Sequence, residues 1–197
     1  MKTLEDVQEL VLGCKKCNCG TTCANKVFSD GNPKSNIMFV GECPGDDEDD
    51  TGLPFQGKCG QVINKFIDSL GLKRQDVYIC NTIKCRPTKP MNNPTEVEVE
   101  NCKEFLFEQI QLVNPKIIVC WGAWAAQTIL ESTAPIGQLR GRVEDFDGTK
   151  VLATYHPSYL LRSPSSIKHI WNDMKLVLDL IDELDYIIKV DDVPDPF

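Results

Sequence analysis

Four short apolar runs constrain the fold of this 197-residue chain more than any other feature of its sequence. They lie at residues 36–40, 77–80, 116–120 and 150–154. Each has the length of a buried strand, and segments with helical periodicity lie between them. Buried strands that alternate with helices are typical of a parallel sheet with helices on both faces. The sequence therefore predicts an α/β fold, a three-layer α/β/α sandwich around a central, mainly parallel four-stranded sheet.

The spacing of apolar residues outside these runs predicts five helices. They lie at residues 3–12, 60–70, 94–113, 123–131 and 165–188. A further strand at residues 143–146 is expected to pair with 150–154 across the turn Asp147-Gly148. This hairpin would add an antiparallel pair to the otherwise parallel sheet.

Length and composition fit one globular domain with a sizeable core. We assign residues 1–190 to it and expect the acidic, proline-containing tail at residues 191–197 to fray. The sequence has no apolar stretch of the length that spans a bilayer, and its first residues do not resemble a signal peptide. We therefore expect a cytoplasmic protein without a membrane partner, and a monomer, since nothing in the sequence requires a dimer.

Polar residues follow each of the four predicted strands. The first is the glycine loop at residues 41–45, which contains Glu42, and the others are Asn81, Trp121-Gly122 and His156. Because Pro157 favours an extended backbone at His156, this histidine should project from a strand end. The carboxyl ends of parallel strands meet at one edge of a sheet, where ligands bind. A carboxylate, an amide and an imidazole are thus expected to form a pocket for a small planar ligand, although a purely structural histidine is an alternative.

Ten cysteines are many for an intracellular chain, where disulfides are rare and metal or cluster binding is favoured. Cys59, Cys80 and Cys120 lie among small or apolar residues and are expected to be buried as small hydrophobic groups. Cys43 lies inside the glycine loop and does not fit that description.

Four other cysteines form a candidate metal centre. Cys14 and Cys17 stand two residues apart before the first strand, Cys85 follows the second strand, and Cys102 lies on the next helix. Four such thiolates could hold zinc or an iron–sulfur cluster. Cys19 and Cys23 crowd the first pair, so spacing alone leaves open which of the early cysteines are ligands.

Three motifs resemble the iron–sulfur uracil-DNA glycosylases (family 4) of the uracil-DNA glycosylase superfamily. The first comprises residues 41–57, beginning Gly41-Glu42-Cys43-Pro44-Gly45. The second is Asn81-x3-Cys85-Arg86-Pro87, followed by Asn93-Pro94-Thr95 and Cys102. The third is His156-Pro157-Ser158-Tyr159-Leu160-Leu161-Arg162. The resemblance covers roughly residues 10 to 180 in the order of the family.

This resemblance implies a DNA repair enzyme that hydrolyses the bond between uracil and deoxyribose and leaves an abasic site. The partner would be uracil-containing DNA, single- or double-stranded. The resemblance also implies a structural 4Fe–4S cluster. Its ligands would be Cys14, Cys17, Cys85 and Cys102.

The family motifs also imply roles for single residues. His156 would donate a hydrogen bond to uracil O2, Glu42 would orient or deprotonate the attacking water, and Asn81 would read the Watson–Crick edge. Phe55 would stack on the base, with core packing as the alternative, and Glu48 would crowd the position of a thymine methyl group. The implied substrate-binding set is Gly41, Cys43, Glu48, Phe55, Asn81 and His156.

A base inside a duplex is out of reach, so it would have to be flipped out. Leu160, Leu161 and Arg162 could fill the gap, although the two leucines could equally be core residues. The net charge of −8 argues against indiscriminate binding to nucleic acids. Candidates for phosphate contacts are therefore confined to local basic clusters, namely Lys84, Arg86, Arg140 and Arg142.

Two features depart from the family pattern. Cys43 stands where the family more often has alanine, and the acidic run at residues 46–50 is heavy for a loop facing DNA. Its simplest interpretation is a solvated turn. Residues 137–142 contain no histidine, whereas a related branch uses a histidine in a basic loop there to bond covalently to DNA. We therefore expect turnover.

Other functions stay open at this point. One is a uracil-DNA binding protein of the same fold that is non-catalytic or traps its DNA covalently. Another is a zinc-stabilised α/β hydrolase that acts on a small metabolite.

Overall fold

The computed structural model describes residues 2–87 and 93–191, with side chains up to residue 184. A six-stranded sheet forms its centre, in the order β1-β3-β2-β4-β6-β5. The strands are β1 (Asp30–Gly31), β2 (Ile37–Gly41), β3 (Tyr78–Asn81), β4 (Ile117–Trp121), β5 (Val143–Phe146) and β6 (Thr149–Thr154). The four inner strands pair in parallel, and the two edge strands pair antiparallel to their neighbours.

The predicted α/β fold is confirmed, but the predicted count of four strands is wrong. The four apolar runs are the parallel inner strands, and β5 joins β6 through the expected turn, in which Asp147 and Gly148 both have positive φ. The other additional strand, β1, has two residues. A segment that short carries no alternating pattern from which a strand could be predicted.

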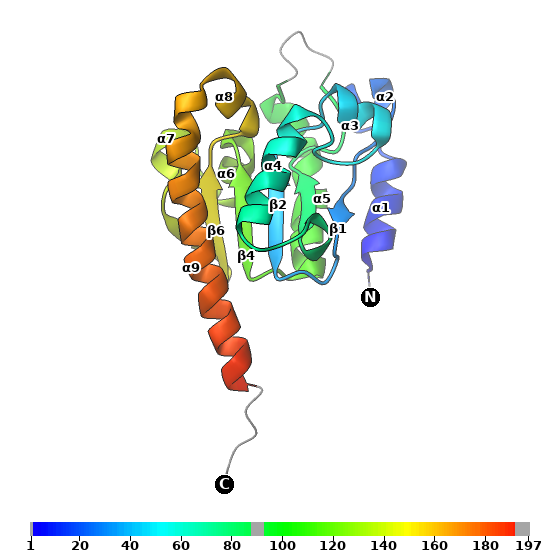
Figure 1. Ribbon diagram of the computed structural model, residues 1–197. Coiled ribbons are helices and arrows are strands. Elements are labelled where there is room, and N and C mark those ends of the chain that lie inside the picture. The colour runs from blue at the N-terminus through cyan, green and yellow to red at the C-terminus, as the bar shows by residue number, and fades with distance from the viewer. Residues whose placement is uncertain (1, 88–92, 192–197) are drawn as a thin grey trace.

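Helices cover both faces of the sheet (Figure 1). On one face lie α4 (Lys58–Ser69) and α9 (Ile167–Asp191), and on the other lie α5 (Glu96–Val113), α6 (Ala123–Ile129) and α7 (Ile136–Leu139). Alternate side chains of a strand point to opposite faces. Phe39 of β2 therefore joins the core beneath α4 and α9, whereas Met38 and Val40 join the core beneath α5 and α6.

The N-terminal helix α1 (Leu4–Leu12) packs beside the sandwich through a small third core formed by Val7, Val11, Phe28 and Phe105. It begins with a capping box in which Thr3 and Asp6 bond each other's backbone N–H. Helices α2 (Cys19–Thr22), α3 (Asp46–Thr51) and α8 (Pro157–Arg162), together with the 3₁₀ turns Arg74–Asp76 and Pro164–Ser166, complete the described elements.

The five long helices were predicted to within three residues at each end, whereas α2, α3, α7 and α8 were not predicted. Each of these four has six residues or fewer, too few for helical periodicity to emerge. The acidic run at 46–50 therefore belongs to helix α3 and is not a solvated turn. The tail at residues 191–197 was expected to fray; Asp191 is the last residue of α9, and residues 192–197 lie outside the described residues.

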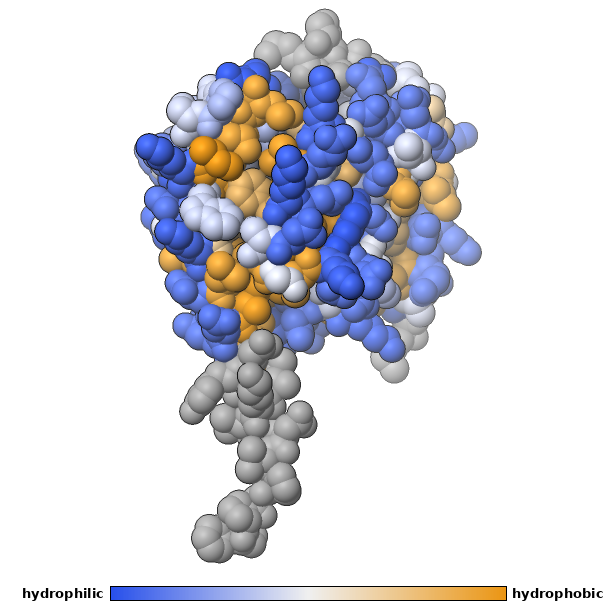
Figure 2. Space-filling model, viewed as in Figure 1, coloured by the Kyte–Doolittle hydropathy of each residue, from blue (hydrophilic) through white to orange (hydrophobic). Residues whose placement is uncertain are grey.

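The surface shown in Figure 2 is mainly hydrophilic, with apolar side chains along α9 and near α8. Exposed apolar residues there include Leu161, Ile167 and Trp171. In the described part of the chain, every helix is too short or too polar to cross a membrane.

Candidate functional site

The carboxyl ends of the parallel strands meet at the upper edge of the sheet in Figure 1 and enclose a pocket of about 230 Å³. The pocket contains the carboxylate, amide and imidazole that the sequence predicted to converge. It is lined by Glu42, Cys43, Pro44, Gly45, Glu48, Phe55, Cys59, Asn81, Asn93, His156, Ser158 and Arg162. Three strand ends therefore contribute to one site, from β2, β3 and β6.

Gly41 permits two pocket residues to approach the end of β2. Its partner in the parallel ladder is Asn81. A Cβ atom at position 41 would lie 2.3 Å from Asn81 Oδ1 and 2.3 Å from Phe55 Cζ. Any side chain at this position would displace both the amide and the aromatic ring.

Asn81 presents an unsatisfied acceptor at this site. Asn81 is 1% exposed, and its Oδ1 atom has no hydrogen-bond partner among the described residues. A buried polar atom without a partner costs about 1–3 kcal/mol. Because Asn81 lines the pocket, a ligand with an N–H group directed at Oδ1 would remove that cost.

The imidazole of His156 is held as a neutral donor. His156 is the N-cap of α8, and its Nδ1 atom accepts the backbone N–H of Ser158 at 3.2 Å. Since a backbone N–H can only donate, Nδ1 carries a lone pair and the ring proton is on Nε2. Burial lowers the pKa of His156 to about 4, and the positive charge of Arg162 acts in the same direction. At neutral pH the ring is therefore an uncharged Nε2–H donor.

Glu42 is fixed by the start of α6. Its Oε1 atom accepts the backbone N–H of Trp124 at 3.1 Å. Gly122, with φ of 105°, is needed there because a Cβ atom would lie 2.4 Å from Oε1. Burial raises the pKa of the Glu42 carboxyl, and the backbone N–H groups of Trp124 and Ala123 oppose that shift. The Trp121-Gly122 element thus supports the carboxylate, and Trp121 itself is buried in the core.

Phe55 and Glu48 come from the segment after β2, in which Glu48 lies on α3 and Phe55 lies in the loop that follows it. The Phe55 ring is buried, and its centroid lies 6.4 Å from that of His156. Glu48 lines the pocket, but its carboxylate closes the loop: Oε2 accepts Gly45 N–H at 2.8 Å, and Oε1 accepts Gln56 N–H at 2.8 Å. The bonds to the loop show how Glu48 is held, whereas its expected contact with a thymine methyl group stays a prediction.

Two cysteines line the same pocket. Burial raises the pKa of both Cys43 and Cys59, so both remain thiols at neutral pH. Cys59 was predicted to be a core residue; it packs against the core but is only partly buried, because it lies in the first turn of α4 and also lines the pocket. Cys80 and Cys120 are fully buried, as predicted.

Lys84 is buried and is therefore not available to contact a DNA phosphate. It is 1% exposed, and its Nζ atom donates to Asn81 O at 2.6 Å and to the Oε1 atom of Gln109. The prediction of a phosphate contact is therefore wrong for this residue, because its partners are buried carbonyl groups. Arg86 forms an ion pair with Asp46 of α3.

Arg140 is bound within the protein. Its guanidinium donates to the buried carboxylate of Asp173 at 2.6 and 3.1 Å and to His169 O at 2.7 Å. Asp173 also accepts the Thr154 hydroxyl at 2.6 Å. Arg142 is more exposed and pairs with Glu144 at 2.5 Å.

The third motif reaches the mouth of the pocket. Arg162 lines the pocket, Leu161 is 47% exposed, and Leu160 packs partly against the core. Leu161 is thus accessible to a partner, whereas Leu160 belongs partly to the protein interior.

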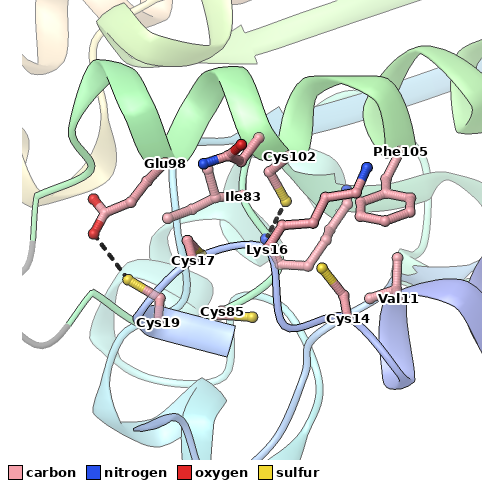
Figure 3. A pocket seen from close by; sticks show the side chains of 12 residues that line it. Val11, Cys14, Lys16, Cys17, Cys19, Ile83, Cys85, Glu98, Cys102 and Phe105 are labelled. Carbon is pink, nitrogen blue, oxygen red and sulfur yellow. Dashed lines mark hydrogen bonds between the residues drawn. The ribbon is translucent and has the colours of Figure 1, made fainter. Parts of the chain in front are cut away.

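A second pocket brings together the predicted ligand cysteines from three separate segments (Figure 3). Cys14, Cys17, Cys19, Cys85 and Cys102 line it, with Val11, Ile83 and Phe105 among its apolar walls. The Sγ atom of Cys102 accepts the backbone N–H of Lys84 at 3.4 Å. Thiolates bound to an iron–sulfur cluster commonly accept such bonds.

Cys19 differs from the other thiols of this pocket. Its Sγ atom donates to the buried Oε1 atom of Glu98 at 3.0 Å. Cys23 lies beside Cys85. Among the described residues, no three Cys, His, Asp or Glu side chains already stand in the arrangement of a metal site. The four predicted ligand cysteines thus line one cavity, Cys14, Cys17, Cys85 and Cys102.

Known proteins of one family are similar to this chain over most of its length. The family model described as "Uracil DNA glycosylase superfamily" matches residues 28–175. A type-4 uracil-DNA glycosylase of Archaeoglobus fulgidus is 40% identical over 91% of this chain and 94% of its own length. That of Thermotoga maritima is 42% identical over 83% of this chain and 85% of its own length. That of Sulfurisphaera tokodaii is 38% identical over 91% of this chain and 86% of its own length.

The geometry of His156 leads to a spectroscopic prediction. In ¹⁵N-labelled protein, we expect the imidazole to titrate with a pKa of about 4 and to be the Nε2–H tautomer at pH 7. Long-range ¹H–¹⁵N NMR spectra would measure both properties, with the His156→Gln variant to assign the signals. A ring that protonates near pH 6.5, or that carries its proton on Nδ1, would contradict this assignment.

Proposed function

This chain belongs to the uracil-DNA glycosylase superfamily, and from that membership we propose that it hydrolyses the N-glycosidic bond of deoxyuridine in DNA. The products are free uracil and an abasic site. The observation that best supports this function is the unsatisfied Oδ1 atom of Asn81 in a pocket that also holds Glu42 and a neutral His156. These groups complement uracil in both binding and reaction.

Asn81 selects the base. Its Oδ1 atom accepts the N3–H of uracil, and its NH₂ group donates to O4. Cytosine presents an acceptor at N3 and a donor at C4, so each contact would be lost. Each buried group left unpaired costs about 1–3 kcal/mol, which favours uracil over cytosine.

His156 acts on the leaving base, and Glu42 acts on the attacking water. The bond between C1′ and N1 breaks, and its electron pair stays on uracil. His156 Nε2–H donates to O2, where negative charge develops, and stabilises the leaving group. Water bonds to C1′ through its oxygen, and its proton passes to the Glu42 carboxylate. The raised pKa of Glu42 makes this carboxylate a better base.

The remaining pocket residues hold the extruded nucleotide. Phe55 stacks on the base, with Gly41, Cys43 and Glu48 beside it. Leu161, which is exposed and directly precedes the pocket residue Arg162, fills the space that the base leaves, and Arg162 contacts the DNA backbone. Arg142 can exchange its surface carboxylate for phosphate, whereas Arg140 contributes mainly through its bonds to Asp173.

We further propose that Cys14, Cys17, Cys85 and Cys102 hold a 4Fe–4S cluster. It supplies no chemistry to the reaction and ties the N-terminal segment to β3 and α5. The support is the shared pocket, the N–H of Lys84 directed at Cys102, and the bond that engages Cys19 with Glu98.

Uracil excision tests the function directly. The protein should release uracil from single- or double-stranded oligonucleotides, and Asn81→Asp should lower kcat/KM about 10- to 100-fold, because one lost contact of 1–3 kcal/mol has that effect. The exposed Asn172→Asp variant is the matched control. Strand cleavage after alkali treatment measures the product. Uracil binding without release would indicate a binding protein, and a DNA–protein adduct would indicate covalent trapping.

The pH dependence should report Glu42. As the pH falls through the raised pKa of this carboxyl, the base is protonated and kcat/KM should fall, with an apparent pKa above 4.5. His156 protonates only near pH 4, so it should not set this limb. Glu42→Gln should lower kcat by about 10²–10⁴ and abolish the limb.

His156→Gln should lower kcat while the acid limb stays at the same pH. The exposed Glu9→Gln variant should match the unmodified protein. A limb that disappears in His156→Gln and persists in Glu42→Gln would reverse the two assignments.

Iron content tests the cluster. Cys85→Ser should lose most of the iron and the visible absorbance and should melt at a lower temperature, because a structural cross-link is lost. Cys19→Ser should keep its iron, since that thiol is bonded to Glu98. Elemental analysis of protein purified without oxygen would measure both. A colourless protein with zinc, or iron loss in Cys19→Ser, would contradict the proposed ligand set.

A further inference from the structure

We propose that Arg74, which lies outside all three sequence motifs, is a positioning residue that holds the Phe55 ring in the orientation required for stacking on uracil. The proposal rests on the proposed function, since that function makes Phe55 the stacking residue. Arg74 would act through the backbone carbonyl groups of Pro54 and Phe55.

The backbone of Phe55 has an unfavourable conformation. Its φ is 52°, in the left-handed region that residues other than glycine seldom adopt. Such a conformation persists at functional sites when the surrounding structure holds it. The surroundings of Phe55 should therefore contain groups that fix this segment.

Arg74 provides these bonds from outside the loop. It lies on the 3₁₀ turn Arg74–Asp76 and donates from Nη2 to Pro54 O at 2.5 Å and from Nη1 to Phe55 O at 3.4 Å. Glu48 binds the other side of the ring residue, through Gln56 N–H at 2.8 Å and Gly57 N–H at 3.3 Å. Among the hydrogen bonds of the described residues, Arg74 alone reaches the backbone of 54–57 from beyond the loop and the start of α4.

The guanidinium is itself fixed in two directions. Its Nε atom donates to Asp30 Oδ2 at 2.7 Å, and its Nη1 atom donates to Asn64 Oδ1 at 3.0 Å. Asp30 belongs to β1 and pairs with Ile79 of β3. Arg74 therefore connects the stacking residue to the sheet and to α4. A lysine, with one ammonium group, could not make all four contacts at once.

Two glycines show how little freedom this segment has. A Cβ atom at Gly60 would lie 1.8 Å from Phe55 O, and one at Gly41 would lie 2.3 Å from Phe55 Cζ. The carbonyl and the ring are thus closely packed at both ends of the residue. A small rotation of the backbone at Phe55 would carry the ring away from its position beside the pocket.

A double-mutant cycle tests this role. Arg74→Gln should weaken inhibition by free uracil and raise KM about tenfold, with a smaller change in kcat, because base binding is lost. In a Phe55→Ala background the same substitution should change neither value further. Lys150→Gln, which breaks an exposed ion pair with Asp145, is the control and should match the unmodified protein. Equal effects of Arg74→Gln in both backgrounds would overturn the proposal.

A second measurement is independent of activity. The NMR signals of the Phe55 ring, assigned by their loss in Phe55→Leu, should shift or broaden in Arg74→Gln and stay unchanged in Lys150→Gln. If Arg74→Gln does not fold, Arg74→Lys takes its place. This variant keeps the ion pair with Asp30 but loses bonds to the backbone, so the Phe55 ring signals should still shift, by a smaller amount. Unchanged ring signals would refute the positioning role. Absence of uracil release by the unmodified protein would instead refute the proposed function and leave this measurement valid.

Discussion

The parallel pairing of β2 with β3 organises both pockets. Gly41 stands opposite Asn81, and the pairing continues past the strand ends through Thr82 N–H to Gly41 O at 2.8 Å and Ile83 N–H to Glu42 O at 3.1 Å. The first strand thereby delivers the carboxylate, and the second delivers the amide and, four residues later, Cys85. Lys84 lies between the two pockets, with its Nζ atom on Asn81 O and its backbone N–H on Cys102. A shift of one residue in this ladder would displace the residues of both sites.

The pocket at the strand ends combines an anion, a neutral hydrogen-bond donor and a cation. Glu42 is a half-buried carboxylate, His156 is an uncharged donor, and Arg162 is the nearby cation that favours the ionised form of Glu42 and the neutral form of His156. Burial is the largest cause of both pKa shifts: it raises the pKa of Glu42, where Arg162 acts against it, and lowers the pKa of His156, where Arg162 acts with it. In the proposed reaction, the oxygen of the leaving base would meet a donor that is already uncharged, so no proton would have to be removed from the histidine before the bond breaks.

The sequence predicted the convergence of Glu42, Asn81 and His156 because each follows a recognisable strand, and the parallel topology does the rest. The predicted phosphate contact of Lys84 was wrong, and the sequence does not indicate the partners of Arg140 and Arg74. A charged residue reads as exposed unless its partners are visible, and these partners lie on other elements: Gln109 for Lys84, Asp173 for Arg140 and Asp30 for Arg74. Cys59 packs against the core only partly, since it lies in the first turn of α4 and also lines the pocket.

The acidic run at 46–50, which departs from the family pattern, has a structural role in this protein. It forms α3, where carboxylates in the first turn interact favourably with the helix N-terminus. Asp49 accepts the backbone N–H groups of Ala24 and Asn25, Asp46 pairs with Arg86, and Glu48 closes the loop that carries Phe55. Three of the five charges therefore bind groups of the protein itself. Ala24 and Asn25 follow the cysteine-bearing segment, and Glu48 lines the active-site pocket. Helix α3 therefore connects the two regions through its carboxylates.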